Sequence, residues 1–119
     1  MGYTVVDVQD LPGEGPGGVV KKTRKALGAQ AFGFNWFELP PGLKGREHDE
    51  TDSGQEEVML VVSGSGRLRV DGEEIELRPG RFVRLDPETT RCPVAGDAGL
   101  TFVTFGAPVG GGYEPPPWG

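Results

Sequence analysis

The chain has 119 residues, which is enough for one domain with a single sandwich or barrel core. Only 35% of the residues are hydrophobic, whereas 21 are glycine and 11 are proline, a balance that favours short strands joined by tight turns. Acidic residues outnumber basic ones by 18 to 12 and no basic patch is visible, so nucleic acid is not an expected partner.

The N-terminal sequence MGYTVVDVQD lacks the basic region and apolar run of a signal peptide. No segment has the continuous apolar length of a transmembrane helix, so a membrane partner is not expected. The single cysteine, Cys92, excludes an internal disulfide and fits a reducing compartment. We therefore expect a cytoplasmic protein.

Residues 1–28 are predicted to form an N-terminal region of strands and a basic turn. Residues 3–8 suit a short strand, and the LPGEGPGG stretch after them suits a flexible turn. Residues 19–27 carry four basic side chains and are interpreted as a solvated strand and turn. The alternative is an arm that packs on a second subunit.

Residues 29–106 are predicted to form an all-β sandwich or barrel. Phe32, Phe34 and Trp36 alternate, which indicates a strand with one face in the core or in a dimer interface. The apolar run 58–62 predicts a strand buried on both faces. Further features are a turn at 63–66, a hairpin at Asp71-Gly72, and strands at 67–71, 75–77, 81–85 and 100–105.

Residues 107–119 form a Gly/Pro-rich C-terminal tail that we expect to be extended or disordered. Trp118 is a candidate for docking on the surface.

Two spaced motifs give the strongest signal in the sequence. Gly42, His48, Glu50, Glu57 and Gly64 follow the pattern Gly, five residues, His-x-His, a short loop, Glu, six residues, Gly, with Glu50 in place of the second histidine. A second motif runs from Gly80, and Arg91 stands where its histidine belongs. The chain therefore resembles the cupin superfamily of small single-domain proteins. The resemblance implies a double-stranded β-helix, or jelly-roll barrel, and a homodimer with residues 3–8 and 19–22 as candidate arms.

In cupins, two histidines, a glutamate and a third histidine hold a divalent metal inside the barrel. The resemblance maps these ligands onto His48, Glu50, Glu57 and Arg91. Arg91 cannot ligate a metal, because a guanidinium group stays protonated and has no lone pair to offer. His48, Glu50 and Glu57 would form a three-ligand site for a divalent metal such as Mn, Fe, Zn or Ni.

The competing interpretation is a site without metal. Arg91 would then point into the barrel and form a forked ion pair with Glu57 or Glu50. In either case Arg91 is a candidate for binding an anionic substrate. His48, the only histidine, is also a candidate general base.

Strand alternation decides which neighbours face the barrel. The motif spacing places Glu57 inside and Glu56 outside, and Met59 and Val61 share the parity of Glu57. Cys92 is interpreted as a small buried hydrophobe rather than a nucleophile. Arg84 is interpreted either as a surface residue or as an extra charge at the pocket.

The first hypothesis for function is a small-molecule-binding cupin whose ligand, anionic or sugar-like, contacts Arg91, Glu57, His48 and Met59. The alternative is a metal-dependent enzyme of the isomerase, dioxygenase or decarboxylase type, with a His48/Glu50/Glu57 site. A third class is an interaction module without a ligand. Buried charges argue against that class, because they are costly unless paired or used.

Overall fold

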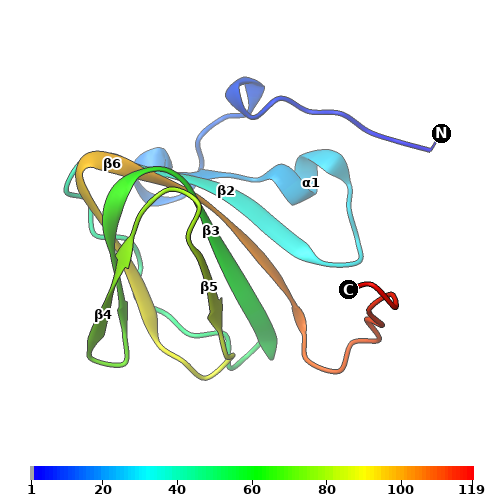
Figure 1. Ribbon diagram of the computed structural model, residues 1–119. Helices are drawn as coiled ribbons and strands as arrows, with labels where there is room; N and C mark the ends of the chain where they lie inside the picture. The colour runs from blue at the N-terminus through cyan, green and yellow to red at the C-terminus, as the bar shows by residue number, and fades with distance from the viewer. Residues whose placement is uncertain (1) are drawn as a thin grey trace.

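The structure is a computed structural model that describes residues 2–119. One curved antiparallel sheet closes into a barrel, with a short helix beside β2 (Figure 1). Within the described residues, no helix has the length and apolar character needed to cross a membrane. The elements in chain order are two 3-10 turns at Val8–Asp10 and Pro16–Gly18, then β1 (Val20–Lys21), α1 (Thr23–Leu27), β2 (Gly33–Leu39), β3 (Gln55–Val70), β4 (Glu73–Leu77), β5 (Phe82–Leu85) and β6 (Arg91–Pro108).

The strand order is β1-β2-β6-β3-β4, and β5 also pairs with β3. β3 and β6 are the longest strands and pair with each other along most of their lengths. The first half of β3 lies between β6 and β5, and its second half lies between β6 and β4. The predicted all-β barrel is therefore confirmed, and β3 and β6 contribute to both of its walls.

The predicted turn at 63–66 is wrong, because these residues continue β3. The pairing with β6 shifts register between Val61 and Ser63 and again between Gly64 and Gly66. Such bulges bend a strand and increase its twist. Gly64 has a φ of 84°, and a β-carbon there would collide with the carbonyl of Gly99. The glycines in this stretch thus allow one strand to bend from one wall to the other.

The hairpin predicted at Asp71-Gly72 is present, and both residues have positive φ, 47° and 84°.

Strand β3 is buried on one face only, contrary to the prediction for residues 58–62. Met59 and Val61 are buried, whereas Val62 is 40% exposed. For the aromatic alternation at Phe32, Phe34 and Trp36, the core alternative is wrong, and the dimer-interface alternative stays a prediction. Phe37 and Leu39 pack in or against the core, and Phe32 on the opposite parity is 47% exposed. An aromatic alternation shows which residues share a face, but it does not show which face is covered.

The N-terminal region differs from the prediction in part. Residues 3–7 form no strand. Within 19–27 the predicted strand is present as β1, whereas residues 23–27 form the single helical turn α1 in place of a turn. The helix ends at Gly28, whose φ is 73° and whose N–H bonds back to the Arg24 carbonyl at 2.9 Å. A helix this short leaves no periodic pattern in the sequence.

The C-terminal end departs from the prediction at two points. Strand β6 runs to Pro108, two residues into the predicted tail. Trp118 is 90% exposed, so the predicted docking of its side chain does not occur within residues 2–119.

The core lies at one end of the barrel interior. Phe37 stacks on Phe102 with ring centroids 4.8 Å apart and an interplanar angle of 11°. Both rings also line a cavity inside the barrel. The buried apolar members of the core are Leu39, Met59, Val61, Leu68, Leu77, Leu85, Ala95, Leu100 and Phe102.

Candidate functional site

The open end of the barrel holds a cavity of about 810 Å³, which we call the barrel cavity. This volume lies in the range of pockets that take small molecules. Every candidate site residue lines it: His48, Glu50, Glu57, Met59 and Arg91. The structure therefore brings the two sequence motifs together around one space.

Glu57 is positioned by the register of three strands. It pairs with Gly106 of β6 on one side and Leu85 of β5 on the other, and Gly106 pairs in turn with Gly33 of β2. Neither glycine adds a side chain at this level, and the Gln55 side-chain oxygen lies over Gly106. Glu56 points outward and accepts a hydrogen bond from Arg84 at 3.2 Å. The predicted orientation of the two glutamates is confirmed.

His48 and Arg91 are brought together by the segment that precedes β3. The His48 N–H donates to the Arg91 carbonyl at 3.0 Å, and the Arg91 N–H donates to the His48 carbonyl at 2.9 Å. Directly opposed residues of an antiparallel pair place their side chains on the same face. The His48 Nε2 atom lies 3.1 Å from the Glu50 carboxylate, whose other oxygen accepts a hydrogen bond from Ser53 at 2.8 Å.

Arg91 is the only charged residue among the buried ones of the described chain, with 1% of its surface exposed. Its Nη1 donates to the Thr89 carbonyl at 3.0 Å. Its Nε and Nη2 find no hydrogen-bond acceptor in residues 2–119. These two groups form one edge of the guanidinium plane, which we call the Arg91 edge.

Glu57 neutralises Arg91 without satisfying its hydrogen bonds. The Glu57 Oε1 atom lies 3.9 Å from the Arg91 Nε, close enough for an ion pair but too far for a hydrogen bond. The predicted partner is thus correct, whereas the predicted forked geometry is not seen. A buried donor without an acceptor costs about 1–3 kcal/mol, and more when it is charged. The Arg91 edge therefore lowers the stability of the fold unless another group accepts its hydrogen bonds.

The environment of Glu57 raises the pKa of its carboxyl above the usual value. Burial is the largest cause, because it disfavours the charged form. The positive charge of Arg91 opposes this effect, and the negative charge of Glu50 adds to it. Inside the cavity, Arg91 therefore lies 3.9 Å from Glu57, and His48 lies 3.1 Å from Glu50.

The remaining cavity wall has an apolar and a polar part. Val19, Phe37 and Leu43 are partly buried apolar residues that pack against the core and line the cavity. Uncharged hydrogen-bonding residues that lie outside the two sequence motifs line it as well: Asn35, Gln55 and Thr104. The alternation of side chains along each strand could have indicated these residues. Gln55 shares the parity of Glu57, and Asn35 and Thr104 are polar residues inside aromatic strands.

The arrangement does not fit the four-ligand metal centre implied by the motifs. No group of three His, Cys, Asp or Glu side chains in residues 2–119 is arranged to hold a metal ion. His48 faces Glu50, whereas Glu57 is beside the fixed positive charge of Arg91. The ligand role of His48, Glu50 and Glu57 stays a prediction from the resemblance.

The two other residues singled out from the sequence lie away from the cavity. Cys92 is fully buried, and its thiol contacts the Gly45 carbonyl at 3.4 Å, which confirms its interpretation as a small buried residue. Arg84 is exposed and binds Asp86 at 2.6 Å as well as Glu56. Arg84 is therefore a surface residue.

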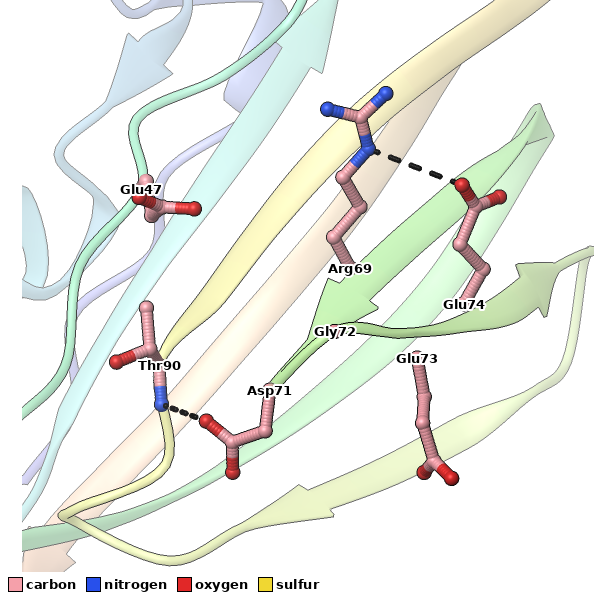
Figure 2. A pocket seen from close by; sticks show the side chains of 7 residues that line it. All are labelled: Glu47, Arg69, Asp71, Gly72, Glu73, Glu74 and Thr90. Carbon is pink, nitrogen blue, oxygen red and sulfur yellow. Dashed lines mark hydrogen bonds and ion pairs between the residues drawn. The ribbon is translucent and has the colours of Figure 1, made fainter.

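A second hollow of about 310 Å³ lies at the β3–β4 turn (Figure 2). Four of its polar residues already interact in two pairs. Asp71 accepts a hydrogen bond from the Thr90 N–H at 3.2 Å, and Arg69 lies 3.9 Å from Glu74. We therefore interpret this hollow as a feature of a charged surface turn.

Comparison with known proteins identifies the family. A family model for the cupin domain matches residues 35–104, which is more than half of the chain. The protein belongs to the cupin domain family, and the predicted double-stranded β-helix, or jelly-roll barrel, is confirmed. No curated protein matches the chain.

Solved structures show the same fold. A cupin protein from Bacteroides fragilis superposes with a TM-score of 0.81 at 21% identity, over 98% of this chain and 92% of that chain. A sugar phosphate isomerase of the cupin superfamily from Silicibacter pomeroyi gives 0.66 at 27% identity, over 74% and 57%. A predicted oxalate decarboxylase from Thermotoga maritima gives 0.54 at 21% identity, over 62% and 64%. Because one fold hosts many activities, the site must decide the function.

Proposed function

We propose that this cupin binds a small anionic molecule in the barrel cavity, with Arg91 as the charged anchor. The observation that carries the proposal is the Arg91 edge, which offers two buried donors that no acceptor in residues 2–119 satisfies. A bound anion would supply the missing acceptors, and Arg–carboxylate hydrogen bonds are among the stronger ones in proteins. His48 and Met59 line the same cavity and would contact the ligand.

The charges around the cavity also support an anion. Arg24, Lys44 and Arg46 lie along its lining, and none of them forms an ion pair within the described residues. Their field would raise the local concentration of anions although the net charge of the chain is −6.

The test is an anion titration with a matched pair of variants. Binding of acetate, gluconate, phenylacetate and inorganic phosphate is measured by calorimetry on the wild type, Arg91→Met and Arg84→Met. We expect at least one anion to bind the wild type and Arg84→Met equally, and to bind Arg91→Met about tenfold or more weakly. Circular dichroism checks that each variant folds. Equal binding to the wild type and Arg91→Met would contradict the proposal.

The second candidate is a metal-dependent enzyme of the isomerase, dioxygenase or decarboxylase type. It is favoured by the common position of His48, Glu50 and Glu57 on the cavity wall. The similarity to the sugar phosphate isomerase and the predicted oxalate decarboxylase supports this class in general terms. We rank it second because Arg91 stands at a ligand position and interacts with Glu57.

We also propose a homodimer that uses the outer face of β2, β6, β3 and β5. The register aligns apolar side chains across these strands, and Phe82 and Phe105 are 67% and 37% exposed. Contiguous exposed apolar patches of this kind are typical of interaction sites.

The N-terminal segment is a second feature that a dimer would explain. It extends beyond the barrel, with Tyr3 79% exposed (Figure 1). The similarity to the Bacteroides fragilis cupin covers 98% of the chain and so includes this segment. Contacts with a second copy would explain its extended course.

A further inference from the structure

The barrel cavity combines a charged end with an apolar wall, and this combination restricts its ligand. We infer that the ligand is a monocarboxylate with an apolar body, whose carboxylate binds the Arg91 edge and whose body packs on the Phe37 side of the cavity. The inference rests on the proposed anion binding and specifies the chemical class.

The shape of the Arg91 edge favours a carboxylate. Nε and Nη2 donate in parallel along one side of the guanidinium plane, which matches the two coplanar oxygens of a carboxylate. The third group, Nη1, is already used by the Thr89 carbonyl and holds the plane in place. A single anchoring edge therefore remains for the ligand.

The neighbouring charges limit the ligand to one negative charge. Arg91 is the one buried positive charge of the cavity, with the Glu57 carboxylate beside it and Glu50 in the same lining. A second carboxylate or a phosphate dianion near Arg91 would face these like charges, because the other cations of the lining, Arg24, Lys44 and Arg46, are exposed to solvent. Like charges held close together in a site of low dielectric repel strongly.

The apolar wall requires a ligand with more than a charged head. Val19, Phe37 and Leu43 are only partly buried, so their side chains retain surface that faces the cavity. Burying apolar surface contributes about 25 cal/mol per Å², a gain that a fully hydroxylated ligand would forgo. The stacked Phe37–Phe102 pair also offers the edge of an aromatic cluster to a flat apolar group.

The carboxylate can reach the Arg91 edge only if Glu57 turns aside. The Arg91 side chain is 1% exposed, and the Glu57 carboxylate lies 3.9 Å from its Nε. Gly106 pairs directly with Glu57 and has no side chain of its own, and the Gln55 side-chain oxygen lies over it. Because no hydrogen bond from Arg91 holds Glu57, its displacement forfeits only a loose ion pair.

The test compares ligands that share one body and differ in their heads. Calorimetry on the wild-type protein measures phenylacetate, its neutral analogue phenylacetamide, its two-carboxylate analogue phenylsuccinate and the bare head acetate. We expect phenylacetate to bind about tenfold or more tightly than each of the other three. Leu43→Asn, which makes one wall position polar, should weaken phenylacetate several-fold and leave acetate unchanged.

Each outcome separates this inference from the proposed function. If gluconate or phosphate binds through Arg91 as tightly as phenylacetate, anion binding stands and the apolar monocarboxylate is overturned. Equal affinity for phenylsuccinate and phenylacetate would overturn the limit of one charge, and equal affinity for phenylacetamide would remove the role of the carboxylate. If no anion binds in an Arg91-dependent way, the proposed function and this inference both fail.

Discussion

His48 and Arg91 face each other across an antiparallel bridge whose two backbone hydrogen bonds measure 3.0 and 2.9 Å. The bridge ties the first motif to the start of β6 and holds both side chains at the cavity. Each of the two residues then pairs with a different glutamate, His48 with Glu50 and Arg91 with Glu57. The backbone bridge therefore holds His48 and Arg91 together whatever their side chains bind.

The His48→Ala substitution should destabilise the fold only slightly. Glu50 keeps its hydrogen bond from Ser53, and the backbone bridge to Arg91 does not depend on the imidazole. We expect the free energy of unfolding to fall by about 0.5–1 kcal/mol, as for a partly exposed ion pair. Urea denaturation measures this change, with Glu47→Ala on the same segment as the control. A loss of several kcal/mol would show that the side chain, rather than the bridge, holds the segment.

The Glu57→Gln substitution should increase the affinity for a monocarboxylate. It removes a negative charge next to the Arg91 edge, and glutamine has nearly the same shape. We expect phenylacetate to bind about tenfold more tightly in calorimetry. Glu56→Gln is the matched control, because the adjacent Glu56 points outward to Arg84. A lower affinity in Glu57→Gln would instead indicate that Glu57 contacts the ligand directly and favourably.

Stability should depend on pH through Glu57. Its pKa is raised in the folded protein, chiefly by burial, above the ordinary value of 4.5. A raised pKa means that the folded state holds this proton more tightly than the unfolded state does. The contribution of Glu57 to stability is then fully present below pH 4.5 and is lost as the pH rises through the folded pKa. Urea titrations from acid to neutral pH should show the wild type losing stability relative to Glu57→Gln. Parallel curves for the two proteins would disagree with the raised pKa.

Metal content distinguishes the two candidate functions. We expect protein purified without a histidine tag to contain Mn, Fe, Ni and Zn far below stoichiometric amounts, because the positive charge of Arg91 lies beside Glu57 and no three-ligand group is formed in residues 2–119. Elemental analysis, with EDTA-treated protein as the control, makes the measurement. A stoichiometric metal that is lost in Glu57→Ala would favour the metal-dependent enzyme.

The proposed dimer should depend on the outer sheet face. Light scattering after size exclusion should give the mass of two chains for the wild type. Phe82→Glu places a charge on a face whose neighbouring strand positions are apolar, and should give the mass of one chain. Tyr113→Glu is the control, since Tyr113 is 83% exposed and lies outside the sheet. A monomeric wild type, or a dimeric Phe82→Glu variant, would argue against this interface.

The sequence by itself determined the barrel fold, one hairpin and the direction of several side chains. Alternation along a strand placed Glu57 and Met59 on one face and Glu56 on the other, because neighbouring side chains of a strand always point to opposite sides. The Asp71-Gly72 pair predicted its hairpin for a similar reason, since few other residues adopt two consecutive positive φ angles. Motif spacing predicted the barrel, and both motifs do meet at one cavity.

Tertiary structure alone decided how the site is arranged. Whether Arg91 pairs with Glu57 at hydrogen-bond distance or at 3.9 Å depends on how two walls of the barrel approach each other. The bend of β3 depends on register shifts against β6, so the stretch around Gly64 resembled a turn in the sequence. Which face of β2 is covered depends on the elements packed against it, so the sequence did not decide between the core and an interface for Phe32. Contacts between residues distant in the chain set these features, whereas sequence patterns report only on near neighbours.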